Sequence, residues 1–412
     1  MAYQRFLSTI ERYYVSGDTH KDTPHSPCIN QMVIEGQGNL DVKHLKDAIT
    51  RASLANIGSR LVLTGHLGLS RWVDSGRTAP LSIIDDHGWD GYSDHAADFL
   101  HRPLPVRKGP TTEVILLKGN TTHHLIFRSH KGVMDSRGIQ HFTNDVFSIL
   151  HGEKPLGENC QINDIQLAKS LNMPRENVDL YEDVAAPTGI KTSIETDKTS
   201  SWIRKTLQGK HKSLQAKVAI EIARFSRLHG EDKVRFQLPM DMRPRMTNLY
   251  STANLTGRIL VDVSAQTSIV DLNADIQQQR AQNNEAEVPR LFRYQFLNWI
   301  PQFIIRHKSN ALAHKRQMNC RFRTSGEILD LGLIPVASYC GAGLIAQKVF
   351  FIPPEINTTA LYVTLAGHPE GVDIIMRAPA YLDGGKLTQL LEFVVEGINH
   401  HRAAEALTSV QN

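Results

Sequence analysis

Residues 125–142, LIFRSHKGVMDSRGIQHF, combine side-chain types that could carry out acyl transfer. An apolar run ends in His130, Lys131 follows directly, and Asp135 and the small residue Ser136 come a few positions later. Moving an acyl group from a thioester to an amine or a hydroxyl needs one group that takes the nucleophile's proton and donors that face the developing oxyanion. A short loop after a buried strand suits this reaction, because the strand end fixes the direction of a catalytic side chain.

The other polar residues of the segment are suited to shaping the loop. A buried carboxylate is costly without a cationic partner, so we expect Asp135 to pair with an arginine and to hold the loop. Ser136 and Gly138 favour a tight turn and a close approach of the backbone to a substrate, and we predict both as substrate-binding residues. Arg137 is expected either as a solvated charge or as a ligand to a phosphate of the substrate.

Lys131 allows three interpretations. As a neutral base, its pKa would have to fall from about 10.4 to about 7, which costs roughly 4–5 kcal/mol. As a cation, it could polarise the thioester carbonyl or hold an acidic substrate, and leave the proton to His130 or to the amine itself. In the third interpretation the loop has lost its base and the protein binds partners without catalysis. We predict His130 and Lys131 as the catalytic residues.

Hydrophobic periodicity predicts the elements that position this loop. Residues 111–119 and 123–130 read as a hairpin that leads into it, and residues 138–152 read as an amphipathic helix that follows it. Residues 26–36 read as a strand, and residues 40–56 have apolar side chains at helical spacing.

The second half of the chain also alternates between helix and strand patterns. Residues 151–200 are rich in Gly, Pro, Thr and charge, which indicates a linker or a loop-rich crossing. Helices are predicted over 212–230, 268–287 and 384–402, and strands over 233–245, 253–263, 348–353 and 360–379. The pattern predicts an α/β protein with one lobe over residues 1–175, a linker over 176–200 and a second lobe over 201–412.

The composition limits the class of protein. A chain of 412 residues with 41% apolar and 21% charged residues suits two globular domains. A net charge of +4 is too small for this length to predict nucleic-acid binding, and we expect no nucleic-acid partner. The four cysteines lie far apart and without clustered histidines, so neither a disulfide scaffold nor a metal site is predicted.

No apolar stretch reaches the roughly 20 residues of a membrane span, and the N-terminus lacks the apolar core of a signal peptide. We therefore expect a cytoplasmic protein. The most apolar stretch, residues 291–307, is expected to form a buried or groove-facing amphipathic helix. Trp72, Trp89, Trp202 and Trp299 are expected to pack in the core or at an interface.

The loop resembles the His-His-x-x-x-Asp-Gly motif of the condensation-domain and CoA-dependent acyltransferase superfamily, which includes chloramphenicol acetyltransferase. His130 corresponds to the first histidine, Lys131 replaces the second, Asp135 is the aspartate and Ser136 replaces the glycine. Five further segments resemble the family in the same order along the chain. They are FLSTIERYYV (6–15), INQMVIEGQGNLDVKHLKDAITRASLANIGSR (29–60), DSRGIQHFTNDVFSIL (135–150), LPMDMRPRMTNLYSTANLTG (238–257) and ILDLGLIP (328–335).

The resemblance implies an α+β sandwich fold with two chloramphenicol-acetyltransferase-like lobes, arranged as a V-shaped pseudo-dimer with a central tunnel. It implies Arg243 as the partner of Asp135, with Arg245 as the competing arginine, and Asn254 as a substrate-binding residue. The implied reaction is transfer of an acyl or aminoacyl group from a pantetheine thioester to an amine or a hydroxyl in secondary metabolism. No cofactor is expected to be bound permanently.

The expected partners are acyl-CoA, or an acyl- or peptidyl-carrier protein that bears the phosphopantetheinyl donor, together with a small-molecule nucleophile. The alternative is an inactive relative that binds a carrier protein or a partner acyltransferase. A basic cluster is expected to be a solvated helical face or, as an alternative, a surface that attracts phosphates or an acidic carrier. Its members are Arg306, His307, Lys308, His314, Lys315, Arg316, Arg321 and Arg323. His123 and His124 are expected as strand residues with one ring facing solvent.

Overall fold

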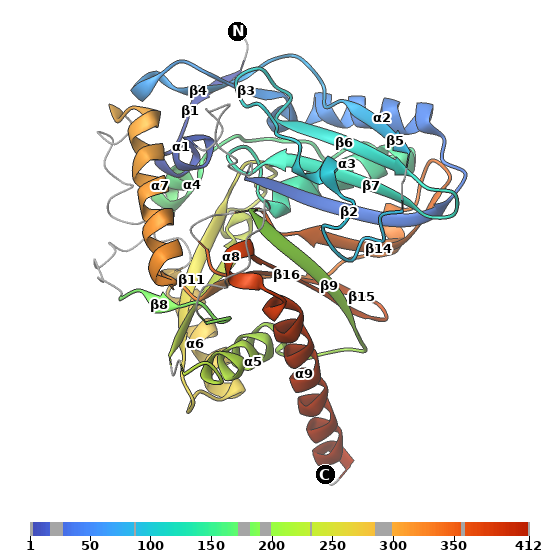
Figure 1. The fold of residues 1–412 in the computed structure, drawn as a ribbon. Helices are drawn as coiled ribbons and strands as arrows, with labels where there is room; N and C mark the ends of the chain where they lie inside the picture. Colours follow the sequence, from blue (N-terminus) through green and yellow to red (C-terminus); the bar gives the residue numbers. More distant parts are fainter. Residues whose placement is uncertain are drawn as a thin grey trace.

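The computed structural model describes most of the chain in eight segments. They are residues 3–16, 28–85, 88–171, 182–189, 199–230, 233–284, 299–355 and 359–410. These segments form two large sheets that lie one above the other, each with helices on its outer face (Figure 1). The predicted α/β class is confirmed, and most of the predicted linker lies outside the described residues.

The first sheet has five strands in the order β14-β2-β7-β6-β5. Its strands are β2 (Ile29–Gly38), β5 (Leu81–Asp85), β6 (Thr112–Lys118), β7 (His123–His130) and β14 (Leu344–Ile352). Neighbours are antiparallel except β5 and β6, which are parallel. Helices α2 (Val42–Ala55) and α3 (Ser136–Leu150) pack their apolar sides on this sheet. The predicted hairpin and both predicted helices are therefore confirmed.

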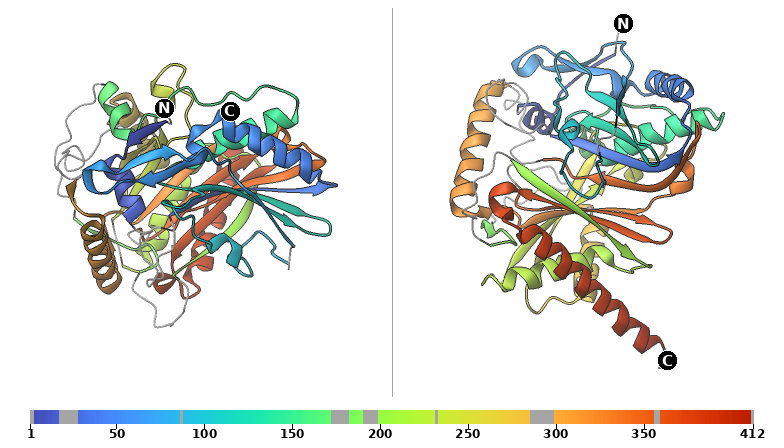
Figure 2. Two further views of the ribbon diagram at one scale, coloured as in Figure 1. Left: turned by 90° about the horizontal axis from the view of Figure 1, so that it is seen from above. Right: turned by 45° about the vertical axis from the view of Figure 1, so that its right-hand side comes forward.

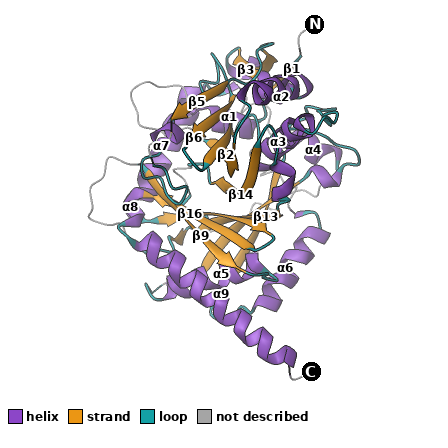
Figure 3. Cartoon of the chain, turned by 90° about the vertical axis from the view of Figure 1, so that its right-hand side faces the viewer, coloured by secondary structure: helices purple, strands orange, loops and turns teal. Residues whose placement is uncertain are grey.

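The second sheet has six strands in the order β11-β10-β13-β15-β16-β9. Its strands are β9 (Ser200–Gln208), β10 (Val234–Asp241), β11 (Thr256–Val263), β13 (Gly326–Leu333), β15 (Tyr362–His368) and β16 (Gly371–Pro379). Helices α5 (Leu214–Arg227), α6 (Ile269–Ala281) and α9 (Lys386–Val410) cover its outer face, as Figure 3 shows. Apolar residues of these helices and strands form the largest core cluster.

One strand of the first sheet comes from the second half of the chain. Strand β14 runs antiparallel to β2 over eight paired positions, from Leu344 opposite Gly38 to Ile352 opposite Gln31. In Figure 2 the orange β14 lies beside the blue strand β2. The division of the chain into 1–175 and 201–412 stays a prediction. It does not account for β14, which belongs to the second half of the chain but pairs with a strand of the first.

Smaller elements surround the two sheets. They are β1 (Gln4–Phe6), β3 (Leu61–Thr64), β4 (Arg71–Asp74), β8 (Val184–Ala185), β12 (Arg321–Phe322), α1 (Thr9–Ser16), α4 (Asp164–Ser170), α7 (Gln302–Asn319) and α8 (Ala380–Asp383). Short 3-10 helices lie at Ile57–Arg60, Leu67–Leu69, Asp98–His101, Arg243–Arg245 and Val336–Tyr339. No helix in the described segments is long and apolar enough to cross a bilayer.

Three expectations from the sequence were wrong or incomplete. The region 151–200 contains helix α4, which a capping box starts at Asn163. Of the helix expected over 291–307, residues 291–298 lie outside the described segments, and the described helix begins only at Gln302. Trp299 is 61% exposed, whereas the other three tryptophans are buried as expected.

Candidate active site

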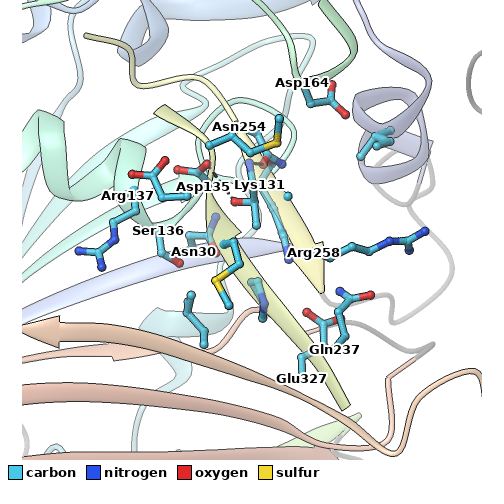
Figure 4. Close-up of a pocket in the computed structure, with 18 of the residues that line it drawn as sticks. Asn30, Lys131, Asp135, Ser136, Arg137, Asp164, Gln237, Asn254, Arg258 and Glu327 are labelled. Atoms are coloured by element: carbon cyan, nitrogen blue, oxygen red, sulfur yellow. Dashed lines mark hydrogen bonds between the residues drawn. The ribbon is translucent and has the colours of Figure 1, made fainter. Parts of the chain in front are cut away.

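A cavity of about 800 Å³ lies between the two sheets, beside the carboxyl end of β7. Asn30 and Lys131 line it from the first sheet and its loop, Gln237 and Glu327 line it from the second sheet, and Tyr14 lines it from α1. Figure 4 shows Lys131 on one side of this pocket and Gln237 and Glu327 on the opposite side. The predicted tunnel stays a prediction, but the lysine does lie in a space between the two halves of the chain.

Backbone hydrogen bonds fix the loop after β7. The Lys131 N–H donates to the carbonyl of Cys28 at 2.8 Å, and the N–H groups of Val133 and Met134 both donate to the carbonyl of His130. The side-chain amide of Asn30 donates to the Met134 carbonyl at 2.7 Å. The turn is thus tied to β2 and to the strand that it leaves, so that Lys131 projects from a rigid backbone.

Asp135 caps α3 and joins the two halves of the chain. Its carboxylate accepts from the Gly138 N–H at 2.6 Å, which satisfies one of the free amides of the helix N-terminus. It also accepts from the Leu255 N–H at 2.7 Å and from the Thr256 hydroxyl at 2.9 Å. The predicted ion pair with Arg243 is present, with two guanidinium contacts at 2.9 and 3.2 Å. Asp135 therefore has the geometry of a structural residue.

Arg243 is half-buried and lies beside two carboxylates. It contacts Asp241 at 2.8 Å as well as Asp135, and it donates to the carbonyls of Ser251 and Ala253. Burial alone would lower the Arg243 pKa, but the two carboxylates raise it above its ordinary value. The competing Arg245 is exposed and donates to the carbonyl of Arg280. The pairing with Asp241 is an addition to the Asp135 pair and does not replace it.

Three of the four predicted substrate-binding residues line the cavity. Ser136, Arg137 and Asn254 line the cavity, and the Asn254 amide also donates to the Lys131 carbonyl at 2.8 Å. Arg137 donates to the carbonyl of Leu331 at 3.0 Å, so it is neither fully solvated nor free of protein contacts. Their binding roles stay predictions.

Gly138 is not among the described residues that line the cavity, and its substrate-binding role stays a prediction. It lies against the backbone of Thr252, where a Cβ would be 2.0 Å from the carbonyl oxygen. The glycine is needed for close packing of α3 against the second half of the chain, a contact that a sequence pattern does not reveal.

Gly138→Ala should therefore destabilise the protein. The new Cβ would collide with a backbone oxygen, so no side-chain rotation can relieve the clash. We expect the free energy of unfolding to fall by roughly 1–3 kcal/mol. Urea denaturation measures this change, with Ser148→Ala on the same helix as a control that should leave the midpoint unchanged. An unchanged midpoint for Gly138→Ala would contradict the packing.

His130 is not among the described residues that line the cavity, and its catalytic role stays a prediction. Its side chain is fully buried, and its Nδ1 accepts from the Gly132 N–H at 3.1 Å. No histidine is among the described residues that line the cavity. His130 therefore supports the turn, and a proton-transfer role at the substrate would require a side chain that reaches the cavity.

Lys131 is 7% exposed and lines the cavity between two tyrosines. Its Nζ lies 5.2 Å from the ring centre of Tyr14 and 5.4 Å from that of Tyr362, distances typical of cation–π contacts. Burial lowers the Lys131 pKa, but Tyr14, Tyr362, Glu327 and Cys28 together raise it well above its ordinary value. This direction favours the cationic interpretation over the neutral base.

The cavity residues that were not identified from the sequence include Tyr14, Asp164, Glu327 and Tyr362. Burial raises the pKa of the Asp164 carboxyl to about 7, and the nearby Glu11 carboxylate adds to this effect. Asp164 lies in the stretch that composition indicated as a linker. Only the capping pattern of Asn163 and Gln166 could have pointed to an ordered helix there.

Asp164→Asn should stabilise the protein at alkaline pH and not at pH 4. Because the folded-state pKa lies above the ordinary value of 3.8, the fold loses stability as the pH rises from about 4 through about 7. The full pKa shift corresponds to at most about 4 kcal/mol, and relaxation of the structure around the charged carboxylate reduces this cost. We therefore expect Asp164→Asn to raise the free energy of unfolding by about 2 kcal/mol at pH 8. Urea denaturation at both pH values measures it, and equal effects at pH 4 and pH 8 would contradict this account.

The histidine doublet and the basic cluster differ from expectation. His123 and His124 are both buried. His123 Nε2 contacts the Gly38 carbonyl at 2.9 Å, and the centre of the His124 ring lies 4.7 Å from that of Trp89. Most of the basic cluster is exposed or half-buried on or near α7, as a solvated face would be. Arg316 is buried, however, and together with Arg323 it lines the cavity.

No protein-family model matches the sequence, and no curated protein matches it. Solved structures do match. The condensation domain of the Monacolin K polyketide synthase MokA is similar with a TM-score of 0.63 and 11% identity over 96% of each chain. The first condensation domain of the CDA synthetase has a TM-score of 0.63 and 13% identity, over 96% of this chain and 95% of that one.

The epimerization domain from the third module of tyrocidine synthetase B is also similar, with a TM-score of 0.59 and 12% identity over 97% of this chain and 96% of that one. Identity this low establishes the fold alone. The resemblance predicted from the sequence is confirmed at that level: the protein has the fold of condensation domains along almost its whole length.

Proposed function

We propose that the protein transfers an acyl or aminoacyl group from a pantetheine thioester, carried by CoA or by a carrier protein, to an amine or a hydroxyl. The condensation-domain fold over 96% of the chain supports this reaction class, as does the cavity between the two sheets. The observation that carries the proposal is the buried ammonium group of Lys131 in that cavity. Secondary metabolism is the proposed setting, in line with the synthetases named among the similar structures.

In the proposed reaction the nucleophile attacks the thioester carbonyl carbon and a tetrahedral oxyanion forms. The Lys131 ammonium stabilises the negative charge on this oxygen, since a fixed cation in a water-poor cavity acts strongly on developing charge. The C–S bond then breaks, and the proton of the nucleophile ends on the leaving thiolate as a thiol. The proton thus passes from the nucleophile to the thiol, and Lys131, as a cation, is not the group that takes it.

Acyl transfer can be tested with the purified protein and acyl thioesters of N-acetylcysteamine of graded chain length. A panel of amines and alcohols serves as acceptors, and mass spectrometry detects the amide or ester. We expect product with at least one pair at a rate that depends on Lys131. A complete absence of product, combined with tight binding of a carrier protein that is unaffected by mutation of Lys131, would overturn the proposal.

That second outcome would support the alternative function, an inactive protein that binds a carrier protein or a sister acyltransferase. The observation that favours this alternative is the lack of a histidine among the described residues that line the cavity. In that case the cavity would bind a pantetheine group or its cargo without turnover.

A further inference from the structure

We infer that Asp164 binds the N–H or O–H group of the acceptor, and so determines which nucleophiles enter the cavity. This inference rests on the proposed function and adds a residue for the second substrate. Asp164 belongs to a different element from the loop that carries Lys131, and in Figure 4 it lies at the edge of the pocket, beyond Asn254. The cavity would then hold the thioester and the acceptor from two different walls.

The local structure fixes Asp164 at the cavity wall. It is the first residue of α4, and the helix start is held by reciprocal hydrogen bonds between Asn163 and Gln166 at 2.8 and 2.9 Å. Leu167 and Ala168, on the same helix, are buried in an apolar cluster with Met242. Asp164 itself is 6% exposed and lines the cavity. The carboxyl group is therefore positioned by an ordered helix.

The carboxyl group has hydrogen-bonding capacity to spare. Neither of its oxygens makes a well-formed hydrogen bond within the described part of the chain, although the Ser8 hydroxyl and the Ile165 amide lie near enough to lower its pKa in part. Arg5, the cation that lowers the Asp164 pKa, makes two contacts at 2.6 and 2.8 Å with the buried Glu11 carboxylate. A buried carboxyl group whose oxygens lack hydrogen-bond donors favours a ligand that supplies such donors.

The other carboxylates of the cavity are less suited to this role. Asp135 and Asp241 both pair with Arg243, so each already has a cationic partner. Asp330 is exposed and accepts from the Gly332 N–H at 2.8 Å. Glu327 accepts from the Thr359 hydroxyl at 3.2 Å, and its negative charge acts on Lys131, whose pKa it raises. An N–H or O–H donor that enters the cavity therefore finds an uncommitted acceptor at Asp164.

The ionisation of Asp164 gives the binding a pH dependence. Its pKa is raised to about 7, so the carboxylate fraction increases across neutral pH. The charged groups that act on it are Glu11 on α1, which raises its pKa, and Arg5 on β1, which lowers it. An alkylamine is an ammonium ion throughout this pH range, so above pH 7 it meets a carboxylate in a charge-assisted hydrogen bond and should bind more tightly.

Direct binding tests the inference without turnover. Hexylamine and hexan-1-ol are titrated into the full-length protein between pH 5.5 and pH 8.5, and ligand NMR line broadening gives the dissociation constants. We expect hexylamine to bind about tenfold more tightly at the upper pH, and Asp164→Asn to remove this gain. Asp330→Asn, a carboxylate on another wall of the same cavity, is the matched control and should keep it.

Kinetics separate this inference from the proposed function. With an acyl N-acetylcysteamine donor, Asp164→Asn should raise KM for the amine about tenfold or more and leave KM for the donor within about twofold. Equal hexylamine binding and equal amine KM in the variant and the parent protein would overturn the inference, even if acyl transfer occurs. Loss of hexylamine binding in Asp164→Asn without acyl transfer by the parent protein would support the subsite and contradict the proposed function.

Discussion

Lys131→Met is expected to lower kcat/KM for acyl transfer by about 100- to 1000-fold, the usual cost of removing one group that stabilises an oxyanion. The ammonium group lies in the cavity between Tyr14 and Tyr362, where a methionine keeps most of the volume and loses the charge. Initial rates with an acyl N-acetylcysteamine donor measure the change. The loss should appear mainly in kcat, because the oxyanion forms only during the reaction.

Two further variants make this prediction specific. Lys131→Arg keeps a cation at the site and should retain part of the activity, whereas His130→Ala should lower the stability of the loop because that ring supports the turn. If Lys131→Met is as active as the parent protein, the cationic lysine has no part in the chemistry. A loss confined to acid-bearing substrates would instead indicate that Lys131 holds a substrate carboxylate.

Arg243→Met is expected to lower the free energy of unfolding by roughly 3–5 kcal/mol, because it leaves the buried Asp135 carboxylate without its cation. Asp135 and Asp241 both contact this guanidinium, and Asp135 also caps α3, so the loss would reach both halves of the chain. Urea denaturation followed by circular dichroism measures the effect. The loop that carries Lys131 should be loosened at the same time.

Arg245→Met is the matched control for this prediction. Arg245 lies two residues away in the same 3-10 helix but is exposed, so its replacement should change the free energy of unfolding by at most about 0.5 kcal/mol. In the double variant Arg243→Met with Asp135→Asn, part of the loss should be recovered, since one buried charge is removed. Equal effects of Arg243→Met and Arg245→Met would contradict the central role of this ion pair.

The elements next to the loop could be predicted because their patterns are local. Alternating and continuous apolar residues over β6 and β7, and the apolar face of α3, are complete within short stretches of sequence. The cap of α3 follows from Asp135 itself, and its pairing with Arg243 followed from the order of motifs in a family with the same architecture. The helix cap and the ion pair each depend on a few residues that can be read directly from the sequence.

The rest of the site depends on contacts between distant segments. Strand β14 joins the first sheet through backbone pairing with β2, and no pattern of residue types in β14 predicts this pairing. Tyr14 and Glu327 reach the cavity only because α1 and β13 face each other across it. Asp164 lay in a stretch whose Gly- and Pro-rich composition indicated a loop, so its carboxyl group gave no signal of burial.

His130 and Lys131 are adjacent in the sequence, but their side chains lie in different surroundings. The motif places two potential catalytic side chains side by side, but the strand ends at His130, and the turn begins with Lys131. The first ring is directed into the turn, where it accepts from Gly132, and only the second side chain reaches the cavity. Direction at a strand end depends on backbone geometry that the spacing of residues does not give.

The protonation state of Lys131 tests the account most directly. The protein is labelled with lysine carrying ¹³C at Cε, the Lys131 resonance is identified by its absence in Lys131→Arg, and its shift is followed from pH 6 upward. A cationic lysine predicts the ammonium shift throughout, with no titration up to the ordinary lysine value of 10.5. A titration midpoint near pH 7 would show a neutral amine at working pH, and the cationic role proposed for Lys131 would be wrong.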